Sequence, residues 1–170
     1  MWGCWRGGSS FFNKEQFGAS TMITAVFLRN YKCYQNINFI PISTNSKFTA
    51  YVGNNGIGKS AILEALDTFF NGAGWQPNSV TKYQGAHIAP YVAPVFLIDK
   101  GDVKPTKVQL EQLDKLSKFF WEVTEIKVNI QNPFMKAFFE HRGELLKKIK
   151  EQNKQSSDYY FFPVCKQSRW

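Results

Sequence analysis

The feature that most constrains this chain is a glycine-rich segment, residues 53–60, with the sequence Gly-Asn-Asn-Gly-Ile-Gly-Lys-Ser. It fits the pattern G-x-x-x-x-G-K-[ST], which is typical of loops that bind nucleotide phosphates. Residues 47–52, rich in aromatic and β-branched side chains, are predicted to form a buried strand before the loop. A helix is predicted to follow the loop and to stop at Asn71-Gly72, with an apolar stripe of Ile62, Leu63, Leu66, Phe69 and Phe70. This order of elements makes nucleotide binding the leading hypothesis.

Each position of the loop has a physical task in binding a triphosphate. Glycines adopt positive φ angles, so backbone N–H groups turn inward onto phosphate oxygens at the positive end of the helix. We expect Lys59 to reach the β- and γ-phosphates as the catalytic lysine, Ser60 to ligate Mg²⁺, and Ala61 to offer its N–H to the α-phosphate. There are two alternatives. The segment is either an ordinary glycine turn before a helix, or a loop that binds nucleotide without hydrolysing it. The candidate nucleotide-binding residues are Gly53, Asn54, Asn55, Gly56, Ile57, Gly58, Lys59, Ser60 and Ala61.

The segments around the loop extend the motif. Residues 22–34 read Met-Ile-Thr-Ala-Val-Phe-Leu-Arg-Asn-Tyr-Lys-Cys-Tyr, and an apolar segment with Pro41 follows. Residues 53–66 then read G-N-N-G-I-G-K-S-A-I-L-E-A-L. This order resembles the amino-terminal lobe of ABC-type ATPases of the RecF, SMC and OLD group, which are often described as AAA-family ATPases. The matching positions are the turn Asn30, Tyr31 and Lys32, together with Asn55 and the run Leu63, Glu64 and Ala65.

The resemblance implies an α/β P-loop NTPase fold, an ABC-ATPase-like N-terminal lobe with a mixed sheet and flanking helices. It implies ATP and Mg²⁺ as cofactors, and work on DNA in repair, recombination or phage defence. It further implies a homodimer across the nucleotide, or association with a missing C-terminal ATPase lobe. A glutamine that senses Mg²⁺ and the γ-phosphate is expected after the first helix, and Gln76 or Gln84 fits this role, although each is equally well explained as a solvated loop amide.

Two features of the resembled family are missing from the sequence. No Leu-Ser-Gly-Gly-like signature occurs, and no apolar strand ends in Asp-Glu. Residues 95–98 precede Asp99, but Lys100 follows, and we prefer to place this run in the early antiparallel sheet of the lobe. The chain is therefore expected to be the first part of a larger ATPase, weak or inactive in hydrolysis alone.

Two other functions remain open. A self-contained small P-loop phosphotransferase would use Asp99 as its metal-binding carboxylate, but only Arg142 and Arg169 follow the loop to supply a lid. A nonhydrolysing nucleotide-responsive interaction module would use the loop as a switch that orders a partner surface when ATP binds. Replacing Asp99 separates the phosphotransferase from the ATPase lobe.

Composition gives information on the partners of the chain and on its cellular compartment. A formal charge of +8 and a pI near 9.4 suit DNA as a partner, although acidic segments elsewhere in a larger protein explain the charge equally well. Three separated cysteines, Cys4, Cys33 and Cys165, argue against a disulfide framework and favour a cytoplasmic location. No apolar run approaches the roughly twenty residues that span a membrane. His87 and His141 are assigned to loop or helix-surface roles.

We expect the chain to divide into an extension outside the fold at residues 1–21 and an incomplete ATPase domain at residues 22–170. Residues 91–98 and 159–165 are predicted as strands. A helix is expected after Thr106, with Val108, Leu110, Leu113, Leu116 and Phe120 on its apolar side. A further strand is expected from Val123, Ile126, Val128 and Ile130. Asn132 and Pro133 are expected to begin a long helix with an apolar face of Phe134, Phe138, Leu145 and Ile149.

Overall fold

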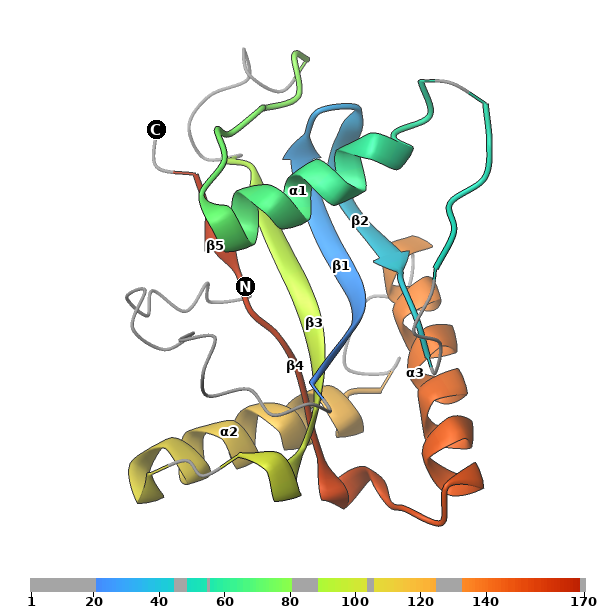
Figure 1. Cartoon of the computed structure of the whole chain (residues 1–170), viewed down its shortest axis with the longest axis vertical. Helices are drawn as coiled ribbons and strands as arrows, with labels where there is room; N and C mark the ends of the chain where they lie inside the picture. Colours follow the sequence, from blue (N-terminus) through green and yellow to red (C-terminus); the bar gives the residue numbers. More distant parts are fainter. Residues whose placement is uncertain are drawn as a thin grey trace.

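A computed structural model of the chain describes residues 21–44, 49–54, 56–80, 89–103, 106–124 and 133–168. Its centre is a sheet in the order β2-β1-β3-β4, with β5 pairing β3 beyond the end of β4 (Figure 1). Every pairing among these strands is antiparallel. The strands are β1 (Met22–Tyr31), β2 (Tyr34–Pro41), β3 (Tyr91–Asp99), β4 (Tyr159–Pro163) and β5 (Lys166–Gln167).

Helices cover both faces of the sheet. Helix α1 (Lys59–Asn71) contacts β1 and β3, whereas α2 (Lys107–Glu122) contacts β4 and α3 (Pro133–Glu151) contacts β2. There are also two short 3₁₀ helices. The first, η5 (Lys100–Asp102), follows β3, and the second, η7 (Ser156–Asp158), precedes β4. Side chains alternate along β1, so Ala25 and Phe27 pack toward α3 while Val26 and Leu28 pack toward α1. The fold is therefore three-layered, and α1 is the one helix on its face of the sheet among the described residues.

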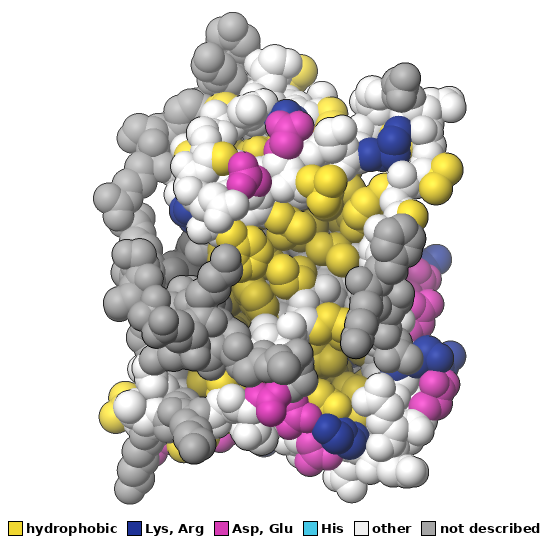
Figure 2. Space-filling model, viewed as in Figure 1, with side chains coloured by type: hydrophobic (Ala, Val, Ile, Leu, Met, Phe, Trp, Pro, Cys, Tyr) yellow, Lys and Arg dark blue, Asp and Glu magenta, His cyan; other side chains and the backbone are white. Residues whose placement is uncertain are grey.

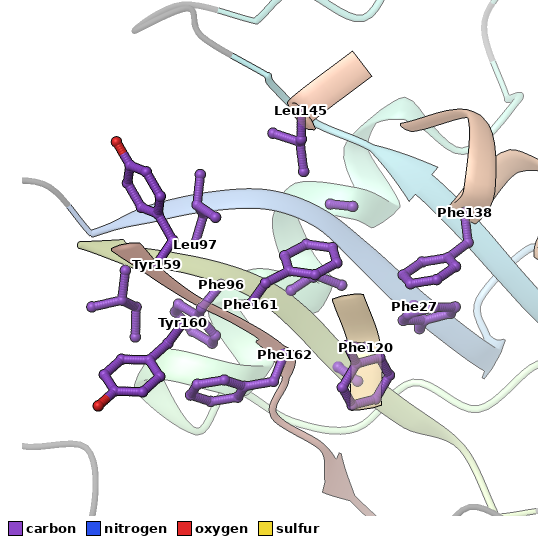
Figure 3. Packing of buried hydrophobic residues seen from close by; sticks show 14 of the residues in the cluster. Phe27, Phe96, Leu97, Phe120, Phe138, Leu145, Tyr159, Tyr160, Phe161 and Phe162 are labelled. Carbon is purple, nitrogen blue, oxygen red and sulfur yellow. The ribbon is translucent and has the colours of Figure 1, made fainter. Parts of the chain in front are cut away.

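Aromatic rings fill the layer between the sheet and α3 (Figure 3). The Phe27 and Phe39 ring centroids lie 4.9 Å apart, and Phe138 from α3 lies 6.1 Å from Phe27. Phe138 also stacks on Phe161 of β4, with centroids 6.0 Å apart and ring planes 15° from parallel. Burial of such side chains contributes about 1.5–3 kcal/mol each, so this layer anchors the sheet on which the site is built.

Proline occupies a central position in β3, where a missing N–H would ordinarily break a ladder. Pro94 is opposite Val26 of β1, and its carbonyl oxygen accepts a hydrogen bond from the Val164 N–H at 2.9 Å. The N–H and C=O groups of one residue point to the same side of an antiparallel strand. The missing donor therefore faces Val164, between the end of β4 and the start of β5, where the ladder is already interrupted.

Most of the predicted elements are confirmed. Helix α1 ends at Asn71, and Gly72 caps it in the left-handed conformation. Helix α2 begins after Thr106 with a capping box, α3 begins at Pro133, and strands occupy residues 91–99 and 159–163. The expected residues 95–98 lie in the central strand of an antiparallel sheet, as the sheet interpretation requires.

The strand predicted at residues 47–52 is wrong where the structure describes it. Residues 49–52 form no strand, and the Val52 side chain is 92% exposed. Side chains tie this segment to the end of β2, because the Thr49 hydroxyl donates to the Ile42 carbonyl at 2.7 Å and the Tyr51 hydroxyl to the Pro41 carbonyl at 3.1 Å. A strand requires backbone hydrogen bonds to a neighbouring strand. Here side-chain hydrogen bonds, and not a backbone ladder, join the segment to β2.

The predicted apolar faces need three corrections. On α1, Leu63 and Phe70 are exposed, and the buried positions are Ala61, Ile62, Ala65 and Thr68. On α2, Phe120 is buried and Leu113 half-buried, but Val108, Leu110 and Leu116 are exposed. On α3, His141 is only 3% exposed, so its expected place on a helix surface is wrong. Val123, which was expected in a strand, is instead the C-cap residue of α2. Predictions for residues 1–20, Asn132 and the rest of that strand, Ile126, Val128 and Ile130, lie outside the described residues.

Candidate functional site

The glycine-rich loop turns sharply into α1. Gly56 and Gly58 have φ angles of 87° and 94°, in the left-handed region that side chains disfavour. At Gly58 a side chain would also collide, since an added Cβ would lie 2.6 Å from the Cys33 sulfur and 3.1 Å from the Tyr34 ring. Glycine is therefore required at this position by conformation and by space.

Helix α1 presents its amino-terminal end at the loop. Gly58 is its N-cap residue, no side chain of the described residues caps it, and its first turn carries no acidic residue. The first-turn N–H groups and the helix dipole thus face the loop without an internal anion. At its other end, the Lys166 ammonium group donates to the carbonyl oxygens of Thr68 and Phe69 at 2.9 and 3.1 Å, which fixes α1 to β5.

Lys59 lies folded across the loop. Its ammonium group donates hydrogen bonds to the carbonyl oxygens of Gly53 and Asn54, both at 2.6 Å. These acceptors are neutral, and phosphate oxygens are stronger partners for an ammonium group. The lysine is therefore positioned beside the loop and can exchange these bonds for phosphate. Ser60 follows it with an exposed side chain, which suits a metal ligand.

A hollow of about 290 Å³ opens between the loop and the turn that joins β1 to β2. Backbone of the loop and the start of α1 form one wall, and side chains of the turn form the other. The residues that line it are Lys32, Cys33, Gly56, Gly58, Lys59, Ser60, Ala61 and Glu64. Five of the nine candidate residues thus meet at one hollow, and Asn55 lies outside the described part of the chain.

Hydrogen bonds and an ion pair hold the β1–β2 turn in place beside α1. Asn30 and Lys32 have φ angles of 51° and 50°. The Lys32 N–H donates to the Gln76 carbonyl at 2.8 Å, and the Asn78 side-chain amide donates to the Lys32 carbonyl at 2.5 Å. The Lys32 ammonium group forms an ion pair with Glu64 of α1. The turn thus brings a second cation to the hollow, on a backbone that hydrogen bonds keep in place.

Tyr34 is hydrogen-bonded to the loop at the start of α1. Its hydroxyl group donates to the Gly58 carbonyl oxygen at 3.2 Å. Burial raises the pKa of Tyr34, and the neighbouring Cys33 adds to this rise, so the hydroxyl keeps its proton at neutral pH. The phenol is therefore a stable donor that holds the helix N-cap.

Exposed hydrophobic side chains surround the loop as well. Val52 and Ile57 of the loop region and Leu63 of α1 are exposed. Figure 2 shows hydrophobic side chains gathered across the face of the molecule below α1. A second hollow of about 290 Å³ lies here, lined by Ile42, Thr49, Tyr51, Lys59, Ser60, Ile62, Leu63 and Leu66. Lys59 and Ser60 therefore border a polar hollow and an apolar one.

Asp99 lies at the other end of the sheet from the loop (Figure 1). Its carboxylate accepts hydrogen bonds from Lys154 at 2.6 Å and from the Gly101 N–H at 2.9 Å. The hydrogen bond from Lys154, followed by that from Gly101, holds the pKa of Asp99 below its usual value. Asp99 is thus part of a structural ion pair, and the structure does not bring it to the phosphate loop as a metal ligand.

The remaining candidate residues have mixed outcomes. Gln76 lies in the segment after α1 with an exposed side chain, and its backbone carbonyl accepts the hydrogen bond from Lys32. Gln84 and His87 lie outside the described residues. Among the described residues, no three His, Cys, Asp or Glu side chains gather in a group that could hold a metal ion. Neither Cys33 nor Cys165 forms a disulfide bond within the described part of the chain.

Three residues of the hollow were not among the predicted site residues. Lys32 and Glu64 appear in the resemblance only as motif positions, and Cys33 only as an unpaired cysteine. A signal for Lys32 was present, because a basic residue follows Asn30 and Tyr31 in a turn that precedes the loop. Nothing local in the sequence shows that this turn meets Glu64, since the pairing joins residues on separate elements.

Comparison with known proteins agrees with this geometry. The family model for the AAA ATPase domain matches residues 22–166. The DNA replication and repair protein RecF of Colwellia psychrerythraea strain 34H is 32% identical over 96 residues, which cover 56% of this chain and 23% of that protein. No helix among the described residues is both long enough and apolar enough to cross a membrane. The resemblance predicted from the sequence is confirmed, and the chain belongs to the AAA ATPase domain family.

Proposed function

We propose that this chain binds Mg·ATP through residues 53–61 and forms the ATP-binding part of a RecF/SMC/OLD-like ATPase. One observation carries the proposal: Gly58 turns the chain so that the uncapped end of α1, Lys59 and Ser60 all meet at one hollow. Backbone N–H groups and Lys59 would neutralise the phosphates, and Ser60 would ligate the Mg²⁺ that accompanies them. Bound Mg²⁺ would supply the charge that stabilises the transferring γ-phosphate.

Hydrolysis, in this proposal, needs groups from outside these residues, either from a second copy of the chain or from a C-terminal ATPase lobe. The sequence has no Asp-Glu strand, and the nearest candidate, Asp99, pairs with Lys154 away from the loop. We therefore expect binding by this chain with turnover well below the roughly 1 s⁻¹ of competent enzymes. Faster turnover by the purified chain would contradict this division of labour.

Binding is tested by calorimetric titration of Mg·ATP into the chain, its Lys59→Ala variant and a matched Lys118→Ala variant. Lys118 is exposed on α2, away from the loop, and its replacement by Ala removes the same positive charge as Lys59→Ala. We expect Lys59→Ala to weaken binding at least about 10-fold, because a charge-assisted bond to phosphate contributes about 1.5–3 kcal/mol. Equal affinities of the two variants would contradict the proposal.

We further propose that the complete ATPase acts on DNA in the cytoplasm, in repair, recombination or phage defence. The name of the RecF relative and the formal charge of +8 support this step. Titration of labelled duplex DNA at several salt concentrations tests it. Affinity that falls steeply with salt and rises with ATP would support a DNA-linked ATPase, whereas binding unaffected by nucleotide would count against it.

A further inference from the structure

We propose that Lys32 and Glu64 form an electrostatic gate on the wall of the phosphate hollow. In the free protein Glu64 holds the Lys32 ammonium group, and a bound polyphosphate draws that group away from Glu64. The inference rests on the proposed nucleotide site and deepens it, since it names the pair that sets the affinity for phosphate. Both side chains line the hollow and form an ion pair across it, from the β1–β2 turn to α1.

Glu64 is electrostatically unfavourable in a site that binds an anion. Among the described residues that line the hollow, it alone has an acidic side chain. A carboxylate in the wall repels phosphate, and the Lys32 ammonium group cancels this repulsion as long as the pair is closed. Glu64 thus lowers the affinity of the hollow for anions, and Lys32 limits that loss.

The ion pair is weak enough to be opened by a ligand. The Lys32 and Glu64 side chains are 25% and 42% exposed, so water screens their attraction. Pairs of this kind contribute about 0–1 kcal/mol, whereas a triphosphate offers several negative charges at once. Within the described residues, the Lys59 ammonium group bonds to neutral carbonyl oxygens, so Lys32 is the lysine of the hollow that must leave a charged partner.

The backbone of Lys32 is held in place, so its side chain can change partners without movement of the turn. Hydrogen bonds from its N–H to Gln76 and to its carbonyl from Asn78 fix the backbone on both sides. The preceding residue, Tyr31, is buried and bonded to Thr68 of α1. An ammonium group on a fixed backbone loses little entropy when it changes partners, which suits an exchange between carboxylate and phosphate.

The test compares Glu64→Gln, Lys32→Met and the double variant with Glu111→Gln, which removes one exposed acid on α2 and matches the change in net charge. Mg·ATP and tripolyphosphate are titrated by calorimetry at low ionic strength. We expect Glu64→Gln to bind both ligands about 3-fold more tightly than Glu111→Gln, and Lys32→Met to bind about 5-fold more weakly than wild type. The double variant should lie within about 2-fold of wild type, since both charges are absent.

Equal binding by Glu64→Gln and Glu111→Gln would overturn the gate, as would a double variant as weak as Lys32→Met. If Lys59→Ala abolishes binding while Glu64→Gln has no effect, the gate fails and the nucleotide site stands. If Lys59→Ala binds Mg·ATP normally, the proposed nucleotide site fails, and the tripolyphosphate series still decides the gate.

Discussion

The Tyr31 hydroxyl group and the Thr68 hydroxyl oxygen lie 2.9 Å apart in the protein interior and join the end of β1 to α1. Thr68 donates its own proton to the Glu64 carbonyl at 2.9 Å, so Tyr31 is the donor in this pair. We expect Tyr31→Phe to lower the free energy of unfolding by about 1–2 kcal/mol. Urea unfolding checks this.

A double-mutant cycle with Thr68→Val isolates the hydrogen bond from other effects of the two substitutions. The coupling energy should be about 1 kcal/mol. A coupling near zero would mean that the two hydroxyl groups do not hold β1 to α1.

Gly58 and Gly72 provide a matched pair at the two ends of α1. Both have left-handed φ angles, 94° and 74°, but an added Cβ collides with Cys33 at Gly58 and meets open space at Gly72. Backbone strain alone should make Gly72→Ala cost about 1 kcal/mol of stability, whereas Gly58→Ala should cost about 2–3 kcal/mol. Equal melting temperatures of the two variants would contradict the tight approach of Cys33 to the loop.

His141 makes stability depend on pH. Burial lowers its pKa below the ordinary value of 6.5, an effect that Glu144 opposes only in part, and its Nε2 has no hydrogen-bond partner among the described residues. The folded state therefore favours the neutral ring, while the unfolded state takes up a proton near pH 6.5. The contribution of His141 to stability is present above that pH and is lost as the pH falls through 6.5 toward the folded pKa.

Unfolding free energies between pH 7.5 and pH 5.5 measure this dependence, with a slope of up to about 1.4 kcal/mol per pH unit from one group. The variant His141→Leu should flatten the slope over this range, whatever its absolute stability. An unchanged slope in the variant would assign the pH dependence to other groups.

Asp99→Asn separates the two enzymatic functions that the sequence left open. Because Asp99 pairs with Lys154 at the end of the sheet away from the loop, we expect Mg·ATP affinity to stay within about 2-fold of wild type. The variant should also lose part of the acid-sensitive stability, since the hydrogen bond from Lys154 holds the Asp99 pKa low. A large loss of Mg²⁺-dependent nucleotide binding would instead support a phosphotransferase.

Local signals in the sequence predict the elements that depend on local interactions. The loop and α1 follow from glycine positions and helical spacing, and the start of α2 follows from Thr106 and Gln109, which form the observed capping box. His141 also had a signal, because it lies on the helical stripe between Phe138 and Leu145, and all three are buried. The surface assignment rests on the absence of Cys or carboxylate partners at ligand spacing and takes no account of this helical position.

Features that depend on distant partners could not be predicted in this way. Residues 49–52 have strand-forming side chains, but the described chain gives their backbone no ladder partner. The pairing of Lys32 with Glu64 requires the β1–β2 turn to fold back onto α1, which the Tyr31–Thr68 bond and the Gln76–Asn78 segment bring about. Such contacts arise from the packed fold and have no signature in the neighbouring residues.

The most direct test of the central claim is an amide NMR titration of the chain with Mg·ATP. We expect the largest chemical-shift changes at Gly56, Gly58, Ser60 and Ala61, whose N–H groups would bind the phosphates. The same titration of Lys59→Ala should need at least about 10-fold more Mg·ATP to produce these shifts. Saturable shifts on another part of the sheet, or no shifts in a folded sample, would contradict phosphate binding by this loop.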